Sequence, residues 1–70
     1  MAMVPIVLHP PSRTGGRRVT VRGEILGLAH SDRDVVEFLR RAGIPEADDL
    51  LDEPAWVMWR GGRAHHYEAA

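Results

Sequence analysis

The 70-residue chain contains no cysteine, and this absence excludes two common supports of small domains. It rules out disulfide bonds and every zinc site built from thiolates. A chain of this length buries only about 60% of the surface that its unfolded form exposes, and its core supplies roughly 3 to 5 kcal/mol. We therefore expect a single domain without a large enclosed active site, for which a partner subunit is the most available extra support.

Lysine is also absent, so all nine basic residues are arginine. Arginine favours planar recognition of phosphate and carboxylate, but GC-rich coding produces the same replacement together with abundant Ala, Gly and Asp. The charges are unevenly distributed: residues 1–30 carry four arginines and one glutamate, whereas residues 31–54 carry eight acids and three arginines. The sequence therefore predicts a bipolar molecule in spite of its net charge of -1.

No segment approaches the roughly 20 consecutive apolar residues of a membrane-spanning helix. Residues 1–8 contain a short apolar run without a basic leader, and so they do not resemble a signal peptide. The lack of cysteine suits a reducing compartment. We therefore expect a soluble, cytoplasmic protein.

The glycine pair Gly61-Gly62 separates two aromatic-rich stretches, residues 55–60 and 63–68. Two glycines supply the positive φ angles that a tight antiparallel turn requires, so the pattern predicts a β-hairpin. One side of this hairpin would belong to the core and the other side would be free for binding. The predicted register pairs Trp56 with Tyr67 and Met58 with His65 on one side, and Val57 with His66 and Trp59 with Ala64 on the other.

Three more strands are predicted in the first half of the chain. Residues 3–8 form a short apolar strand that Pro5 would confine to the edge of a sheet. Residues 17–21 alternate as a half-solvated strand, with Val19 and Val21 on one face. Residues 24–29 are almost continuously apolar, which favours a central strand, and Arg22-Gly23 predicts the tight turn before them.

Ser31 predicts the start of one main helix. Its hydroxyl is suited to capping the first turn, and Asp34 is placed to reach back to Ser31. Gly43 predicts the end of the helix, and residues 46–52 predict a further helical turn. The residues that share the apolar face of the main helix are Val35, Val36, Phe38, Leu39 and Ala42.

The order of these elements predicts the α+β class, with an antiparallel sheet of four or five strands and the main helix packed on one of its faces. No catalytic, metal-binding or nucleotide-binding motif accompanies the pattern. His65 and His66 are adjacent and would point to opposite faces of a strand, so they do not bind one ion together. Ser31 serves as a cap, and the acids of residues 48–53 are typical of a solvated surface. We therefore expect no enzymatic activity, no cofactor and no metal.

Two binding hypotheses remain. The first is a protein-interaction or self-association module, including a homodimer, whose surface is the exposed side of the aromatic hairpin. The opposing interpretation is that both tryptophans only complete the core of a monomer. The residues of the proposed interaction surface are Trp56, Trp59, Arg60, Arg63, His65 and Tyr67.

The second hypothesis is a weak nucleic-acid binder in which arginines near the first strands contact phosphates. The acidity of residues 31–54 counts against it, because these residues would repel phosphates. The arginines that would contact an anion or a nucleic acid are Arg13, Arg17, Arg18 and Arg22, with Arg60 and Arg63 beside them.

Four stretches give the chain a family resemblance. They are residues 9–11 (HPP), 23–29 (GEILGLA), 34–43 (DVVEFLRRAG) and 59–62 (WRGG). In these stretches the chain resembles a group of small uncharacterised actinobacterial proteins of about this length. The resemblance implies a bacterial, cytosolic protein, and it implies no particular activity.

Overall fold

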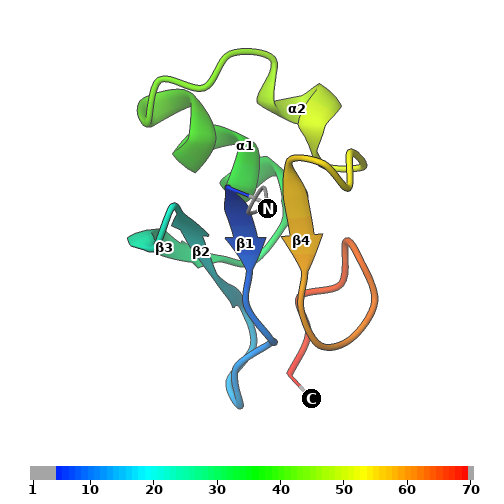
Figure 1. The fold of residues 1–70 in the computed structure, drawn as a ribbon. Helices are drawn as coiled ribbons and strands as arrows, with labels where there is room; N and C mark the ends of the chain where they lie inside the picture. Colours follow the sequence, from blue (N-terminus) through cyan, green and yellow to red (C-terminus); the bar gives the residue numbers. More distant parts are fainter. Residues whose placement is uncertain (1–4, 70) are drawn as a thin grey trace.

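A computed structural model of the chain describes residues 5–69, in which the elements form one sheet and two helices (Figure 1). The predicted α+β class is thereby confirmed. Residues 3 and 4 of the first predicted strand lie outside the described residues. The elements are β1 (Ile6–Leu8), β2 (Arg17–Val21), β3 (Glu24–Ala29), α1 (Asp32–Arg41), α2 (Ala47–Leu50) and β4 (Val57–Trp59).

The sheet is mixed, with the strand order β3-β2-β1-β4. The pairs β1-β2 and β2-β3 are antiparallel, but β4 pairs in parallel with β1. The prediction of a purely antiparallel sheet was wrong, because both helices lie between β3 and β4 and return the chain to the sheet in the direction of β1. The predicted positions of two strands were also wrong, since β1 is internal and β3 forms an edge.

Pro5 does not force β1 to the edge because it lies just before the strand. Its carbonyl accepts a hydrogen bond from the Arg22 N–H at 2.8 Å, and the first ladder donor of β1 is the N–H of Ile6, which reaches the carbonyl of Trp56. A proline at this position removes no donor from the strand itself.

The hairpin between β2 and β3 has the predicted tight turn. Arg22 and Gly23 have φ angles of 51° and 85°, and two positive φ values match the type I′ turn of a two-residue hairpin. The register shifts between Val19 and Thr20, which leaves Leu26 as the extra residue of a β-bulge. Next to it, a Cβ on Gly27 would lie 2.9 Å from the Phe38 ring, so glycine allows α1 to approach β3 closely.

Helix α1 begins and ends as predicted. The Asp34 N–H donates to the Ser31 hydroxyl at 3.2 Å, although the Asp34 carboxylate accepts from the N–H of His30 rather than from that of Ser31. At the other end, Gly43 has a φ of 86°, and the N–H groups of Gly43 and Ile44 donate to the carbonyls of Arg40 and Leu39. These two bonds form a Schellman motif.

The core lies between α1 and one face of the sheet. Val35 and Leu39 are the residues of α1 with no exposed surface. They belong to one cluster with the sheet residues Ile6, Leu8, Val19, Ala29 and Val57. These strand residues alternate with residues that point to the other face of the sheet, and among residues 5–69 no helix packs on that other face.

The predicted C-terminal hairpin was wrong. Gly61 and Gly62 do have positive φ angles of 65° and 74°, but residues 63–68 form no strand, and none of the four predicted side-chain pairings of the hairpin occurs. Strand β4 pairs with β1 instead, which places Val57 beside Ile6 in the core. After β4 the chain makes a wide loop beside that strand, as Figure 1 shows.

Candidate functional site

The wide loop is held in place by Arg17, whose side chain is completely buried. Its side chain donates four hydrogen bonds to backbone carbonyls. Nε donates to the carbonyl of His66 at 2.7 Å, and Nη2 donates to that of Arg63 at 2.9 Å. Nη1 donates to the carbonyls of Arg60 at 2.7 Å and His9 at 3.3 Å. Burial lowers the pKa of the Arg17 guanidinium, although arginine keeps its charge at neutral pH. One cation thus satisfies four carbonyls, one from the residue after β1 and three from the loop after β4.

Trp59 covers this cation. Its ring centroid lies 5.4 Å from the Arg17 Cζ, a cation–π distance. The same ring lies 4.9 Å from the ring of His65 and 5.9 Å, edge to face, from that of Tyr67. The indole N–H donates to the carbonyl of Leu51 at 3.0 Å. Trp59 therefore joins the end of β4 to the loop and to the segment after α2.

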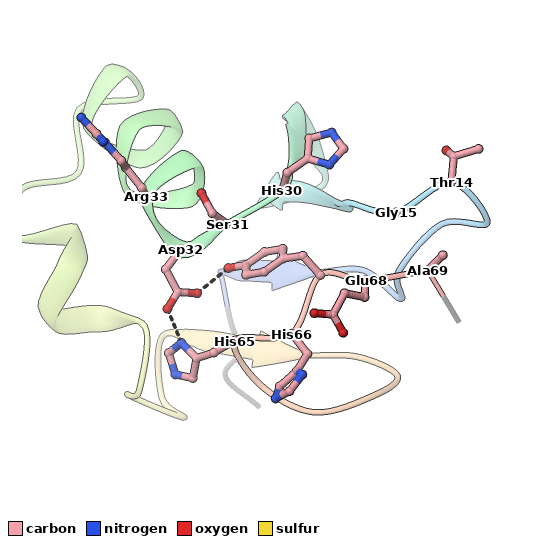
Figure 2. A pocket seen from close by; sticks show the side chains of 11 residues that line it. Thr14, Gly15, His30, Ser31, Asp32, Arg33, His65, His66, Glu68 and Ala69 are labelled. Atoms are coloured by element: carbon pink, nitrogen blue, oxygen red, sulfur yellow. Dashed lines mark hydrogen bonds and ion pairs between the residues drawn. The ribbon is translucent and has the colours of Figure 1, made fainter.

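His65 connects the loop to the start of α1 and to the segment after α2. Its Nδ1 lies 2.6 Å from Asp32 Oδ2, and its Nε2 lies 2.5 Å from Asp52 Oδ1. The Tyr67 hydroxyl donates to the other oxygen of Asp32 at 2.6 Å. We call these four residues the His65 cluster; Figure 2 shows the contacts of Asp32 with His65 and with the tyrosine ring.

The two carboxylates raise the pKa of His65, with the Asp52 hydrogen bond first and the Asp32 hydrogen bond second among the causes. Both ring nitrogens have an acceptor, and only the protonated imidazolium donates from both. Burial and the Asp32 bond also raise the pKa of Tyr67. His65 has a φ of 67°, a conformation that is uncommon outside glycine. The cluster therefore holds a strained backbone position by charge and hydrogen bonding.

A hollow lies beside the His65 cluster, lined among others by His30, Arg33 and His66. In Figure 2 these three side chains point away from Asp32 rather than toward a common centre. Within residues 5–69 no three His, Asp or Glu side chains are placed to hold a metal ion. Both ring nitrogens of His65 are hydrogen-bonded to carboxylates. This arrangement holds the loop against the start of α1 and the segment after α2, and it does not offer a ring nitrogen as a general base.

The raised pKa of His65 predicts how the stability of the protein depends on pH. Because the pKa of His65 is raised in the folded state, its contribution to stability is complete below the unfolded value of about 6.5 and is lost as the pH rises through the folded value. We expect the difference in free energy of unfolding between the wild type and His65→Asn to shrink as the pH rises above the unfolded pKa of about 6.5 and through the higher pKa of the folded state. Urea unfolding followed by circular dichroism over a pH series measures the difference.

The variant His65→Asn suits this experiment because asparagine tolerates a positive φ. His66→Asn is the matched control, since His66 is exposed and its side chain makes no hydrogen bond to another of the described residues. If the difference in free energy of unfolding stays constant or grows from acidic to alkaline pH, the charged form of His65 does not stabilise the loop.

A second site is the sheet face opposite α1. The registers align Met58, Val7, Thr20 and Ile25 in one row across all four strands. A neighbouring row consists of Arg60, His9, Arg18 and Leu28, in which the His9 N–H donates to the Arg18 carbonyl and the Arg60 N–H donates to the Leu8 carbonyl. We call these two rows the open face.

Large apolar side chains are exposed on the open face. Ile25 is 63% exposed, Leu28 46% and Met58 44%. The solvated face of a sheet usually carries polar residues in alternation with the core residues. Ile25 and Leu28 lie together on β3 and Met58 lies on β4 at the opposite edge, so exposed apolar side chains flank the face on both sides.

The open face is also positively charged. Arg18 and Arg60 are exposed, and among residues 5–69 neither has a carboxylate oxygen within ion-pair distance. Burial first, and then Arg60 and Arg18, lower the pKa of His9, which bonds to the Thr20 hydroxyl at 3.0 Å. Arg60 and Arg18 flank His9 in the same row of the face.

The six residues of the interaction surface predicted from the sequence do not form one surface in the structure. Tyr67 is buried and Trp59 is partly covered by the loop, whereas Arg63 and His65 belong to the loop around Arg17. Trp56 is 48% exposed and lies at the end of the sheet beside Pro5 and Ile44. Arg60 alone of the six lies in the two rows of the open face.

The predicted anion-contacting arginines are also divided. Arg17 is buried, so it is not available to a phosphate, whereas Arg13, Arg18 and Arg22 are exposed. Reasoning from the sequence missed Ile25, Leu28 and Met58. A signal for Ile25 was present, since Thr20 alternates with Val19 and Val21 in the predicted strand, and Thr20 and Ile25 flank the predicted hairpin turn at positions that face each other.

Comparison of the chain with protein-family models, with curated proteins and with solved structures found no match. Within the described part of the chain, none of the helices has the length and apolar character needed to span a bilayer. The fold and the site therefore define a class only, that of a small α+β domain with one helix-covered and one open sheet face.

Proposed function

We propose that this chain is a non-enzymatic protein-interaction module that binds through the open face of its sheet. The observation that carries the proposal is the exposure of Ile25, Leu28 and Met58 on the face that α1 leaves uncovered. Exposed apolar side chains beside arginine suit a protein interface, because Met and Arg are enriched in such interfaces. The surface differs from the aromatic hairpin that the sequence suggested, but the functional class is the same.

Nucleic-acid binding is the alternative, and one observation favours it: Arg18 and Arg60 gather on the open face. Single-stranded nucleic acids, however, bind to platforms of aromatic side chains on which their bases stack. The row of Met58, Val7, Thr20 and Ile25 contains no aromatic ring. The chemistry of this row suits aliphatic side chains better than bases.

Selection of peptides from a displayed random library on the immobilised protein tests the proposal. We expect the selected peptides to lose most of their binding to Ile25→Asp and Met58→Gln, since each substitution replaces an exposed apolar side chain of the open face with a polar one. Trp56→Asp is the matched control, because Trp56 is comparably exposed but lies outside the face. Circular dichroism confirms that each variant is folded.

Two results would contradict the proposal. One is a library that yields no binders to the folded protein. The other is a set of peptides whose binding survives both open-face substitutions and is lost with Trp56→Asp, because that pattern would place the interface at the end of the sheet.

A further inference from the structure

The charges of the molecule are separated between its two layers. Eight of its ten acidic residues lie between Asp32 and Glu53, the span that contains α1, α2 and the segment after them. By the strand registers, neither row of the open face includes a carboxylate, whereas it includes Arg18, Arg60 and His9. A partner for the open face must therefore supply both apolar side chains and negative charge.

We infer that the open face binds an acidic segment of another protein in which aliphatic residues alternate or cluster with Asp and Glu. This inference rests on the proposed function and names the partner chemistry of the same site. Aliphatic groups of the segment would pack on Ile25, Leu28 and Met58, and its carboxylates would meet Arg18 and Arg60. A guanidinium pairs with a carboxylate through two parallel hydrogen bonds.

The same charges argue against a two-fold dimer as the occupant. Two copies that stacked their open faces around a two-fold axis would bring together surfaces that both carry arginine and no carboxylate. A copy that instead placed its acidic helical layer on the open face of the next would form a head-to-tail contact, and such contacts build rings or open chains, which light scattering detects as assemblies that grow with concentration.

Defined probes test the inference. The first is a short synthetic peptide in which glutamate and leucine alternate; the others are its arginine-leucine counterpart, a glutamate-only peptide and an oligothymidine. We expect the glutamate-leucine peptide to bind most tightly and to shift the amide signals of the two open-face rows in NMR spectra. Its dissociation constant should rise as salt increases from about 50 to about 200 mM, because exposed ion pairs are screened.

Substitutions test whether Arg18 and Arg60 bind the carboxylates of the peptide. Arg18→Gln with Arg60→Gln should weaken binding of the glutamate-leucine peptide roughly tenfold, since two exposed ion pairs are lost. Arg40→Gln with Arg41→Gln is the matched control on α1, where both arginines lie near Glu37, and it should leave binding unchanged. Light scattering of the free protein over a concentration series should show a monomer at low salt.

Each contrary outcome has a defined meaning. If the arginine-leucine peptide binds to the same rows as tightly, or if the double arginine variant binds normally, the acidic partner is wrong and the interaction module stands. If oligothymidine binds best, the partner is a nucleic acid and both proposals are wrong. If no peptide of either charge shifts the open face, both fail. Growth of the free protein into chains at low salt would identify a second copy as the occupant and overturn the inference.

Discussion

Arg17→Ala is expected to leave the protein largely unfolded at room temperature. The substitution removes a completely buried cation and leaves the carbonyls of His9, Arg60, Arg63 and His66 without their donor. Breaking a buried charged network of this kind costs about 3 to 5 kcal/mol. A core of this size supplies roughly the same free energy, so little net stability would remain. Far-ultraviolet circular dichroism and urea unfolding measure the loss.

The neighbouring residue provides the control for this result. Arg18→Ala removes the same side chain from an exposed position, and it should change the free energy of unfolding by less than about 0.5 kcal/mol. Arg17→Lys should fall between the two, because a single ammonium does not reproduce the planar fork of the guanidinium. Equal stability of Arg17→Ala and Arg18→Ala would show that the four carbonyls find other donors and that Arg17 does not hold the loop.

Trp59→Ala is expected to destabilise the protein by about 3 kcal/mol, toward the lower end of the range for truncation of a large aromatic residue in a core. The ring is only partly buried, but its loss uncovers the Arg17 guanidinium, removes the contacts with His65 and Tyr67 and leaves the Leu51 carbonyl without the indole donor. Thermal and urea unfolding followed by circular dichroism measure this difference without relying on tryptophan fluorescence.

Trp56→Ala is the matched control for the second tryptophan. Trp56 is 48% exposed, and we expect its truncation to cost less than about 1 kcal/mol. The comparison separates the two tryptophans, both of which the sequence analysis included in the interaction surface. A larger loss for Trp56→Ala than for Trp59→Ala would mean that the ring cluster around Arg17 is not the main support of the C-terminal loop.

The burial of Arg17 was not predicted from the sequence, which placed this arginine at the surface in contact with anions. The alternation of β2 already placed Arg17 on the same face as Val19 and Val21. The general rule that arginine is almost never fully buried unless it is paired favoured a solvent position. Its hydrogen-bond acceptors are backbone carbonyls, two of them from residues whose side chains bear like charge, so no carboxylate in the sequence indicated a partner.

The C-terminal hairpin failed for a related reason. Gly61-Gly62 does adopt positive φ angles, as the local signal required. A hairpin also needs the two flanking stretches to pair with each other, but β4 gains a partner in β1 and buries Val57, while Arg17 binds carbonyls of the returning segment. Trp59, His65 and Tyr67 then cluster around the Arg17 cation instead of lying on two faces of a hairpin.

The sequence by itself determined the features whose physical causes lie within a few residues. These are the Ser31 cap and Gly43 end of α1, the Arg22-Gly23 turn, the alternation of β2, the short helix α2 and the concentration of acids around the helices. Only the tertiary structure decided which strand pairs with β4, why an arginine is buried and which sheet face stays open. These outcomes depend on competition among distant segments for the same apolar surface and the same hydrogen-bond donors, and that competition leaves no local signature.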